Sequence, residues 1–384
     1  MKLCSKKNCT GCTSCVNVCP RKAITIKKDE RGFLYPEIDN NKCINCGLCT
    51  KYIESLNEYM KTEEHCYMPF KAYACKNKND NIRERSQSGG LFYTLAENFL
   101  NNNGVVFGCA YDDDFHVIHK RIDNIKNLNQ LLGSKYVQSD LKNCISEIIS
   151  DIKNNRMVLF SGTPCQVAGI SSLLKFKKIN LDNFYTCDFI CHGVPSPLLY
   201  EKYLNLMENK YKSQIVEVNL RDKKAGGWRN HVNSIKFKNG NYIVDKNYVD
   251  LFYSNLGLRI SCENCKYTTL NRPSDITMGD CWGIEKIKNN LWNDNKGISL
   301  ALIQTKKGER LFNRIKENMD LYQISMNEYR QPQMLHSSPV PYQKENFWKD
   351  IKNKKFEKVL KKYTIYGGLK FKLRRKILKI MKRW

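Results

Sequence analysis

The feature that most constrains what this chain can fold into is a run of cysteines near its start, Cys9-x2-Cys12-x2-Cys15-x3-Cys19, followed by proline. Three thiolates at this spacing wrap three irons of one cubane cluster, and the fourth cysteine serves a second cluster where two clusters lie together. Disulfide frameworks and zinc sites do not use this run. The start of the chain therefore predicts an iron–sulfur module.

A second copy of the motif, Cys43-x2-Cys46-x2-Cys49, follows, but Ile53 stands where its fourth cysteine should be. The doubled motif resembles that of the bacterial ferredoxins. In those proteins the fourth cysteine of each motif crosses to the other cluster. By this rule Cys19 completes the second set, so we expect one intact 4Fe–4S cluster there.

The first set, formed by Cys9, Cys12 and Cys15, lacks a fourth thiolate under the same rule. Cys66 can replace it after a longer loop, and Cys4 is a second candidate. Otherwise this cluster is a three-iron form, 3Fe–4S, or keeps a labile iron with a ligand that is not cysteine. The sequence leaves these alternatives open.

Composition indicates how the 18 cysteines should be read. The chain starts without an apolar signal segment, and its short cysteine spacings favour metal over disulfides, so we expect a cytoplasmic protein. No stretch approaches eighteen consecutive apolar residues, which argues against a membrane-spanning helix. The formal net charge of +26 fits a solvated lysine-rich surface better than a nucleic-acid site. An acidic redox partner or an anionic membrane surface suits the same charge.

The pattern of apolar segments divides the chain into regions. We expect residues 1–60 to form the two-cluster module, 70–150 and 151–325 to form the two parts of an α/β domain, and 326–384 to form a basic helical tail. The tail has an amphipathic basic end that suits either docking on the domain or attachment to the inner face of a membrane.

Particular elements can be predicted inside these regions. Short strands are expected at 23–26, 32–36, 105–108, 157–160 and 184–190, and a hairpin over 234–244 turns at Asn239-Gly240. Helices are expected at 91–100 and 167–174. The serines at 86 and 88 can cap the first of these helices, and Gly104 can end it.

A second constellation of cysteines is scattered through the larger domain. Cys165 and Cys191 each follow a predicted strand, and Cys262 and Cys265 form an x2 pair. Because the carboxyl ends of parallel strands meet at one crevice, these four can converge around a further cluster. Cys281 is an alternative ligand there. The remaining cysteines of this domain are expected to be small buried side chains: Cys75, Cys109, Cys144 and Cys187.

Several segments suit an anionic cofactor. Ser88-Gly89-Gly90 opens a helix, where free backbone amides favour phosphate. Lys135, Arg221 and the Gly162-Thr163 loop can add contacts. Because clusters pass single electrons and a flavin is the usual converter to hydride chemistry, these features suggest a nucleotide cofactor. The predicted fold is thus an α+β ferredoxin-like N-terminal module fused to an α/β flavin-binding domain.

Longer motifs carry a family resemblance. They are Ser88-Gly89-Gly90, the segments 133–140, 160–169 and 191–197, Arg221-Asp222-Lys223, and the segment 275–280. Together they resemble the beta-subunit family of coenzyme F420 hydrogenases and dehydrogenases over roughly residues 1–310. The resemblance implies FAD and a further 4Fe–4S cluster close to it. It also implies a deazaflavin substrate in archaeal relatives and an association with surface-polysaccharide synthesis in bacterial relatives.

We therefore expect a cytoplasmic flavin-dependent oxidoreductase that exchanges electrons with a ferredoxin or a redox partner subunit and acts on a small molecule. His192 and Lys223 are the candidates for acid–base help. A non-catalytic electron-relay subunit is the alternative. Nucleic-acid binding is disfavoured, because the motifs gather around cysteines and glycines and not around aromatic and basic surfaces.

Overall fold

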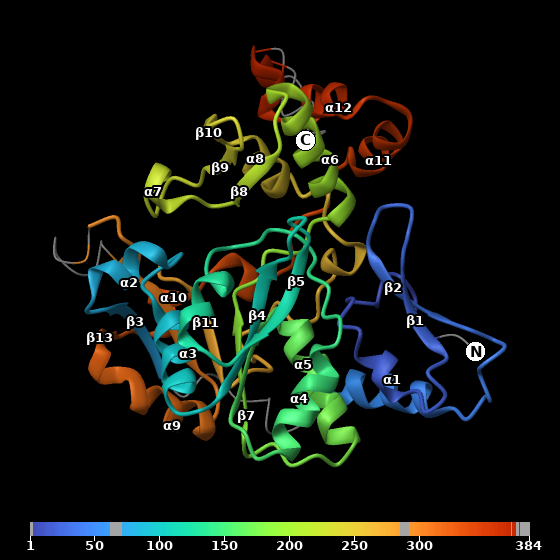
Figure 1. The fold of residues 1–384 in the computed structure, drawn as a ribbon, viewed down its shortest axis with the longest axis vertical. Coiled ribbons are helices and arrows are strands. Elements are labelled where there is room, and N and C mark those ends of the chain that lie inside the picture. Colours follow the sequence, from blue (N-terminus) through green and yellow to red (C-terminus); the bar gives the residue numbers. More distant parts are fainter. Residues whose placement is uncertain are drawn as a thin grey trace.

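An eight-stranded mixed sheet organises the larger part of the molecule in this computed structural model (Figure 1). Four adjacent strands are parallel: β4 (Val105–Tyr111), β6 (Val158–Gly162), β7 (Phe184–Phe189) and β11 (Ile276–Asp280). Antiparallel strands extend both sides: β5 (Val117–Ile122) next to β4, and β12 (Ser299–Ile303), β3 (Lys71–Asn77) and β13 (Met319–Gln323) beyond β11. The structure describes residues 3–61, 71–284, 292, 294–369, 371–373 and 376.

Helices cover both faces of this sheet, which is why its central strands are largely buried and mostly apolar. Helices α3 (Leu91–Asn101) and α9 (Lys306–Ile315) pack on one face, and α4 (Cys144–Lys153) and α5 (Pro164–Phe176) pack on the other. The expected parts 70–150 and 151–325 both supply strands to the one sheet. The predicted α/β domain is confirmed.

The N-terminal unit, drawn in blue in Figure 1, packs outside helix α5. It consists of η1 (Ser14–Val18), the antiparallel strands β1 (Ile24–Lys28) and β2 (Leu34–Ile38), α1 (Leu48–Glu58) and η2 (Tyr59–Lys61). The hydroxyl of Tyr52 on α1 donates a 2.8 Å hydrogen bond to the Gly169 carbonyl on α5. This buried contact fixes the unit against the sheet domain.

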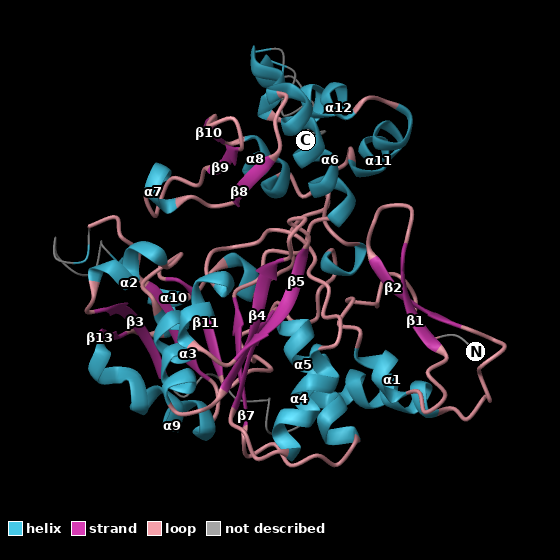
Figure 2. Ribbon diagram, in the orientation of Figure 1, coloured by secondary structure: helices cyan, strands magenta, loops and turns pink. Residues whose placement is uncertain are grey.

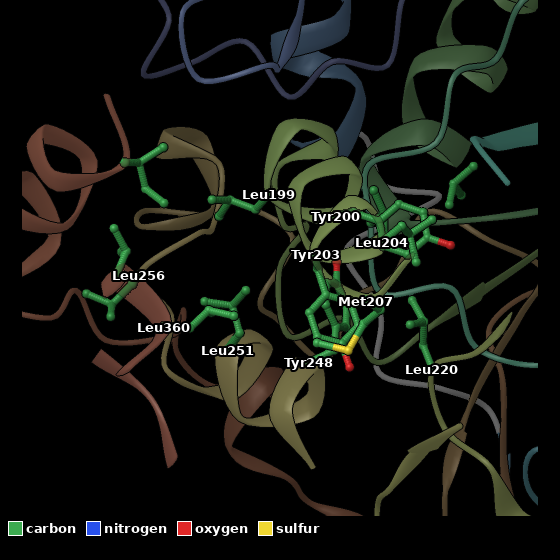
Figure 3. Close-up of a cluster of buried hydrophobic side chains, with 14 of the residues drawn as sticks. Leu199, Tyr200, Tyr203, Leu204, Met207, Leu220, Tyr248, Leu251, Leu256 and Leu360 are labelled. Atoms are coloured by element: carbon green, nitrogen blue, oxygen red, sulfur yellow. The ribbon is translucent and has the colours of Figure 1, made fainter. Parts of the chain in front are cut away.

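A third layer follows β7 in the chain and lies apart from the large sheet in Figure 2. It holds a small sheet of β8 (Ile215–Asn219), β9 (Asn233–Phe237) and β10 (Tyr242–Asp245), with α6 (Pro197–Tyr211), α7 (Lys223–Gly226) and α8 (Asn247–Tyr253). Strands β9 and β10 form the predicted hairpin. Leucine and tyrosine side chains make its core, drawn in Figure 3, where Tyr203 and Tyr248 lie together between α6 and α8.

Two C-terminal helices complete this layer. Helices α11 (Lys344–Asn353) and α12 (Phe356–Tyr363) bury Phe347, Leu360 and Tyr363 in the same core. Within the expected tail, 326–384, the two helices are packed on this layer. Much of its basic end, including 377–384, lies outside the described residues. No helix in the described part of the chain is long and apolar enough to cross a membrane.

Short elements connect these layers: α2 (Asp80–Arg85), η4 (Ile125–Leu131), η5 (Ile260–Cys262), η8 (Lys316–Asn318), α10 (Met326–Tyr329), η9 (Pro332–Met334) and η10 (Ile365–Gly367). The predicted serine cap of α3 is wrong. Gly90 is the N-cap, with a φ of 94° and no side-chain cap. The Ser88 hydroxyl instead donates to the Ile298 carbonyl at 2.7 Å. Helix α5 begins with a capping box between Thr163 and Gln166.

Candidate iron–sulfur and cofactor site

The cysteines of the second motif gather as the crossed rule predicts. Cys19, Cys43, Cys46 and Cys49 all line one small cavity of the N-terminal unit. The Ala23 amide donates to the Cys19 sulfur at 3.3 Å, a contact that helps to set a cluster's reduction potential. Cys46 is exposed. This set, which we call the surface set, therefore lies at the outside of the molecule.

Cys9, Cys12 and Cys15 form an inner set, buried between the N-terminal unit and the sheet domain. Hydrogen bonding from Cys4 and the charge of the Arg259 guanidinium both lower the pKa of Cys9. Burial raises the pKa of Cys15, and Cys12 and Cys9 raise it further. Three or more thiols thus crowd one place. The other candidate ligand, Cys66, lies outside the described residues.

Cys165, Cys191, Cys262 and Cys265 come together as a third set. Burial raises the pKa of Cys165 to about 12, and nearby Cys265 and Cys262 raise it too. Burial and then the other three thiols of the set raise the pKa of Cys191. Cys281 lies elsewhere: it is buried in an apolar cluster with Ala74, near Cys75.

The three sets follow one another through the molecule. Cys49 of the surface set lies close enough to Cys15 of the inner set to raise its pKa. Cys12 of the inner set acts in the same way on Cys165 of the third set. The β-carbon of an alanine at Gly169 would lie 2.7 Å from the Cys12 sulfur. Helix α5, which carries Cys165 of the third set, therefore lies directly against the inner set.

A cavity of about 460 Å³ opens beside the third set. Residues from the carboxyl ends of the parallel strands line it, including Gly162 of β6, Phe189 of β7 and Asp280 of β11. Cys165 and Cys191 form part of its wall, as do Thr10 and Gly11 of the N-terminal unit. Ligand sites of open α/β sheets are usually found at these strand ends. Its volume is in the range of small-molecule pockets, roughly 300–1,000 Å³.

Most of the cofactor residues expected from the sequence line this cavity: Ser88, Gly90, Lys135, Gly162, Thr163 and Arg221. Gly89 is not among its described lining residues, because its amide donates to the Ser299 hydroxyl at 2.9 Å. The ammonium of Lys135 donates to the Leu132 carbonyl at 2.6 Å. Burial lowers the pKa of Lys135 to about 8.

The two acid–base candidates lie in different surroundings. His192 lines the cavity, with Nε2 2.7 Å from the Asn255 amide oxygen and Nδ1 3.2 Å from the Gln333 amide nitrogen. Burial lowers its pKa. Both contacts are satisfied when the neutral ring carries its proton on Nε2, so His192 is held as a wall residue.

Lys223 does not line the cavity in the described structure. Its ammonium donates to the carbonyls of Lys296 at 2.6 Å, Ser88 at 3.3 Å and Arg83. All three of its protons are therefore used to tie the start of α7 to two distant loops. The acid–base role expected for Lys223 stays a prediction, although its ammonium donates to these carbonyls and Lys223 is not among the described lining residues of the cavity.

The sequence reasoning identified Arg221 but missed three other polar residues of the cavity wall, His119, Gln138 and His231. His119 Nδ1, Gln138 Nε2, Arg221 Nε and His231 Nε2 are buried atoms without hydrogen-bond partners in the described structure, and all four residues line the cavity. His119 Nε2 lies 3.0 Å from the Ser161 carbonyl, so Nδ1 is the free acceptor. Burial lowers the pKa of His119 to about 4.

The opposite side of the cavity is aromatic and charged. The guanidinium of Arg221 donates to both carboxylate oxygens of Asp280, at 2.7 and 3.3 Å. The indole of Trp228 also donates to Asp280, at 2.6 Å, and stacks on Trp282 with ring centroids 4.6 Å apart. The Arg221 guanidinium also lies over the Trp282 ring, 5.7 Å from its centroid. Trp282 is 38% exposed and forms part of the cavity wall. Neither tryptophan carries a motif spacing that the sequence could have marked.

Two regions of the chain match known protein families. Residues 155–328 match the family model for the C terminus of the coenzyme F420 hydrogenase/dehydrogenase beta subunit, and residues 8–52 match the 4Fe-4S dicluster domain. The resemblance expected from the sequence is confirmed. We call residues 8–52 the dicluster unit and 155–328 the beta-subunit region.

A curated relative points in the same direction. The F420-dependent formate dehydrogenase subunit beta of Methanocaldococcus jannaschii is 26% identical over 219 residues, which are 56% of this chain and 54% of that protein. The match thus spans about half of its length. A solved chain of the F420-reducing [NiFe] hydrogenase complex from Methanosarcina barkeri has a TM-score of 0.46 and 14% identity. That similarity covers 69% of this chain and 85% of the hydrogenase chain.

The donor sets suit iron–sulfur clusters. No group of three His, Cys, Asp or Glu side chains in the described residues is placed to hold a single metal ion. A cubane, in which each of four irons takes one thiolate, has its ligands farther apart. Burial and mutual repulsion raise the pKa of thiols such as Cys165 and Cys191. A bound cationic cluster keeps such thiols deprotonated. The dicluster unit and the third set therefore fit the group.

The cavity also fits a flavin in chemistry. Buried polar atoms without partners need a ligand that supplies both donors and acceptors, because an unpaired buried group costs about 1–3 kcal/mol. Gln138 Nε2 and Arg221 Nε are donors, and His119 Nδ1 is an acceptor. Leu91, Phe92 and Tyr93 add apolar surface at the start of α3. An aromatic ring edged with carbonyls and imino groups would satisfy both requirements.

Proposed function

We propose that this chain is an iron–sulfur flavoprotein oxidoreductase. It passes electrons between a ferredoxin-type donor and, through FAD, a small hydride-accepting substrate. One observation carries the proposal: Cys165 and Cys191 belong to the third cysteine set and also form the wall of the cavity. A cluster held by these residues would lie against whatever molecule fills the cavity.

The three sets define a route for electrons through the protein. Electrons can travel along it in either direction. Electrons would enter at the surface set, pass the inner set at Cys15 and reach the third set from Cys12 to Cys165. The inner set is buried, and the four cysteines of the third set are part-buried. The exposed surface set is where a redox partner can approach.

The surroundings of the surface set fit an acidic protein partner. Ile44 is 60% exposed and Leu48 is 37% exposed on either side of the exposed Cys46. Arg21, Lys22, Lys42 and Lys51 are exposed nearby in the sequence. Opposite charges steer association and make its rate fall with ionic strength. We therefore expect reduction by an acidic ferredoxin to slow as salt is added.

The cavity residues would hold the flavin and the substrate. A bound flavin would supply the conversion between single electrons and hydride. We assign its binding to the predicted residues that line the cavity, Ser88, Gly90, Lys135, Gly162, Thr163 and Arg221. Neutral His119 would accept a hydrogen bond through Nδ1, and Gln138 would donate one through Nε2. Trp282 would present its ring to a planar substrate.

We take the candidate substrate classes from the relatives. The curated relative is named as F420-dependent, so a deazaflavin is the first acceptor to test. A surface-polysaccharide precursor is the second class, which the resemblance to bacterial members suggests. The test is a turnover assay in which the same protein and the same electron donor are given one substrate class at a time. Turnover of one and not the other assigns the class.

The cofactor test is anaerobic purification of the full chain, followed by iron, sulfide and flavin analysis. The proposal expects cluster iron together with flavin, and flavin reduction by a ferredoxin-type donor. Cys165→Ala should lose the iron of one cluster and slow that reduction. Cys187→Ala is the matched control, since Cys187 is buried in the sheet core and away from the sets. Cluster iron without flavin would contradict the enzyme as proposed.

A non-catalytic electron-relay subunit is the second candidate. The curated relative is itself named as a subunit, which favours work inside a complex. A relay chain would contain flavin that is reduced by the donor but would turn over none of the small acceptors. Turnover by the isolated chain with either substrate class decides against the relay.

A further inference from the structure

A tight turn brings Cys4 against the first cysteine of the inner set. The carbonyl of Ser5 accepts a hydrogen bond from the Cys9 amide at 2.9 Å, which folds the chain back on itself. Outside the turn, the Lys6 ammonium pairs with the Asp29 carboxylate at 3.1 Å. Cys4 is thus held in a defined place and does not trail at a loose end.

The four thiols form one group. The side chain of Cys4 hydrogen-bonds that of Cys9, and Cys4 is near enough to Cys12 and Cys15 to interact electrostatically with both. Cys4 and Cys9 also pack in the same apolar cluster as Phe33. This is the number of thiolates that a 4Fe–4S cubane needs.

Position 53, where the second motif would have its fourth cysteine, offers no ligand for the cluster. Ile53 packs against the apolar cluster that includes Cys15 and Cys49, so an aliphatic side chain stands there. Its neighbour Tyr52 is engaged with the Gly169 carbonyl. In the part of the chain that the structure describes, the cysteines outside the three sets are all in the sheet domain, apart from Cys4.

A buried cation lies beside this group. Arg259 is fully buried, and its guanidinium donates to the Cys9 carbonyl at 2.9 Å, the Cys9 sulfur at 3.5 Å and the Gln138 amide oxygen at 3.3 Å. None of these described acceptors is a carboxylate. The guanidinium also lies over the Tyr35 ring, 3.9 Å from its centroid, which stabilises the charge without neutralising it. Because a buried charge is costly without a counter-charge, an anionic group would be favoured here. A cubane with four thiolates supplies it.

We propose that Cys4 is the fourth ligand of the cluster bound by Cys9, Cys12 and Cys15. Its sulfur binds the fourth iron and releases the thiol proton, with no change of oxidation state. The chain would then replace the cysteine lost at position 53 with one from its own N-terminal turn. Cys4 precedes the region that matches the dicluster domain, residues 8–52, so the motif alone does not include it. The assignment rests on the cluster part of the proposed function and not on its flavin or substrate.

The test compares Cys4→Ala with Cys66→Ala in the full chain, reconstituted anaerobically with iron and sulfide. Alanine is used because a serine oxygen can itself bind iron. We expect Cys4→Ala to contain at least one iron fewer per chain and to give the paramagnetic resonance signal of an oxidised three-iron cluster. Cys66→Ala and the neighbouring control Ser5→Ala should match the wild type. The reverse pattern, or no iron loss in Cys4→Ala, overturns the assignment.

Two further readings keep the result interpretable. The surface cluster of the same unit reports folding, since its signal should persist in Cys4→Ala. If that signal is lost, Cys4→Asp restores a ligand at the same place, and we expect four irons with an altered reduced-state spectrum. A spectrum identical to the wild type would count against Cys4. A wild-type chain without cluster iron would instead contradict the proposed function itself.

Discussion

Gly169 of helix α5 lies so close to the dicluster unit that a β-carbon there would stand 2.7 Å from the Cys12 sulfur. It would also stand 2.6 Å from the hydroxyl oxygen of Ser14, which is fully buried. Neither neighbour can move freely. The contact therefore sets how near the inner set comes to the third set.

Gly169→Ala should separate the dicluster unit from the sheet domain. In an ordinary helix interior, this change stabilises a protein by about 1 kcal/mol. Here overpacking should outweigh that gain and cost about 1–3 kcal/mol. We expect a lower thermal midpoint and slower reduction of the third cluster. Lys153→Ala, at an exposed position of α4, is the control, and a stabilised Gly169→Ala protein would show that the two units are not in close contact.

Arg259→Gln should lower the reduction potential of the inner cluster. The guanidinium lies against Cys9 and favours the more negative, reduced state. Its loss should shift the potential by about 60 mV, which is a tenfold change in equilibrium for a one-electron couple. A potentiometric titration followed by paramagnetic resonance measures this. Arg259→Lys keeps the charge and should shift the potential less; equal shifts in both variants would locate the effect in packing.

Lys223→Met should reduce stability and leave catalysis intact. The change leaves the carbonyls of Ser88 and Lys296 without their donor. Such a loss costs about 1–3 kcal/mol. We expect a lower thermal midpoint, with an unchanged pH–rate profile for the protein that stays folded. Lys224→Met, one residue further and exposed, is the control. A changed pH profile at full stability would restore Lys223 as an acid–base candidate.

His119 should make the fold sensitive to mild acid. Burial holds its pKa at about 4 in the folded protein, against about 6.5 in an unfolded chain. Between these values protons bind only the unfolded chain, so the free energy of unfolding falls as the pH falls. From about pH 7.5 to about pH 5.5 the expected loss is about 1 kcal/mol. Thermal midpoints at the two pH values measure it.

The matched variant is His119→Gln, whose amide can still donate to the Ser161 carbonyl. It should lose less stability than the wild type over the same pH range, because glutamine does not titrate. Equal losses in both proteins would assign the acid sensitivity to other groups. The comparison is made on protein with its clusters loaded, at the same ionic strength.

The cysteine sets were the part of the site that the sequence could predict. Spacing alone grouped Cys19 with the second motif, because a cubane imposes that geometry on neighbouring residues. The pairing of Cys165 and Cys191 with a distant x2 pair followed from a rule of sheet topology, since both follow parallel strands. The second prediction depends on where the strands end, and the pattern of apolar residues along the chain predicts the strands.

The rest of the cavity wall could not be predicted in the same way. His119, Gln138 and His231 come from separate segments with no shared spacing, and only their burial in three dimensions distinguishes them. Lys223 was chosen because it follows Arg221 in a polar motif, and nothing in the sequence indicated that its ammonium donates to carbonyls of remote residues. Cys4 was one of two cysteines considered as the missing fourth ligand. The sequence could not single it out, because a local turn and not a motif brings it to Cys9.

The loop between Cys9 and Cys12 belongs to the inner set and to the cavity at once, because Thr10 and Gly11 form part of the cavity wall. Gly11 has a φ of 78° and lies against Gln138 and Arg259. A ligand in the cavity and a cluster held by the inner set would share this loop, so we expect the binding of one to affect the other. By reciprocity, a ligand that binds the reduced protein tenfold more tightly must make that protein easier to reduce by the same factor.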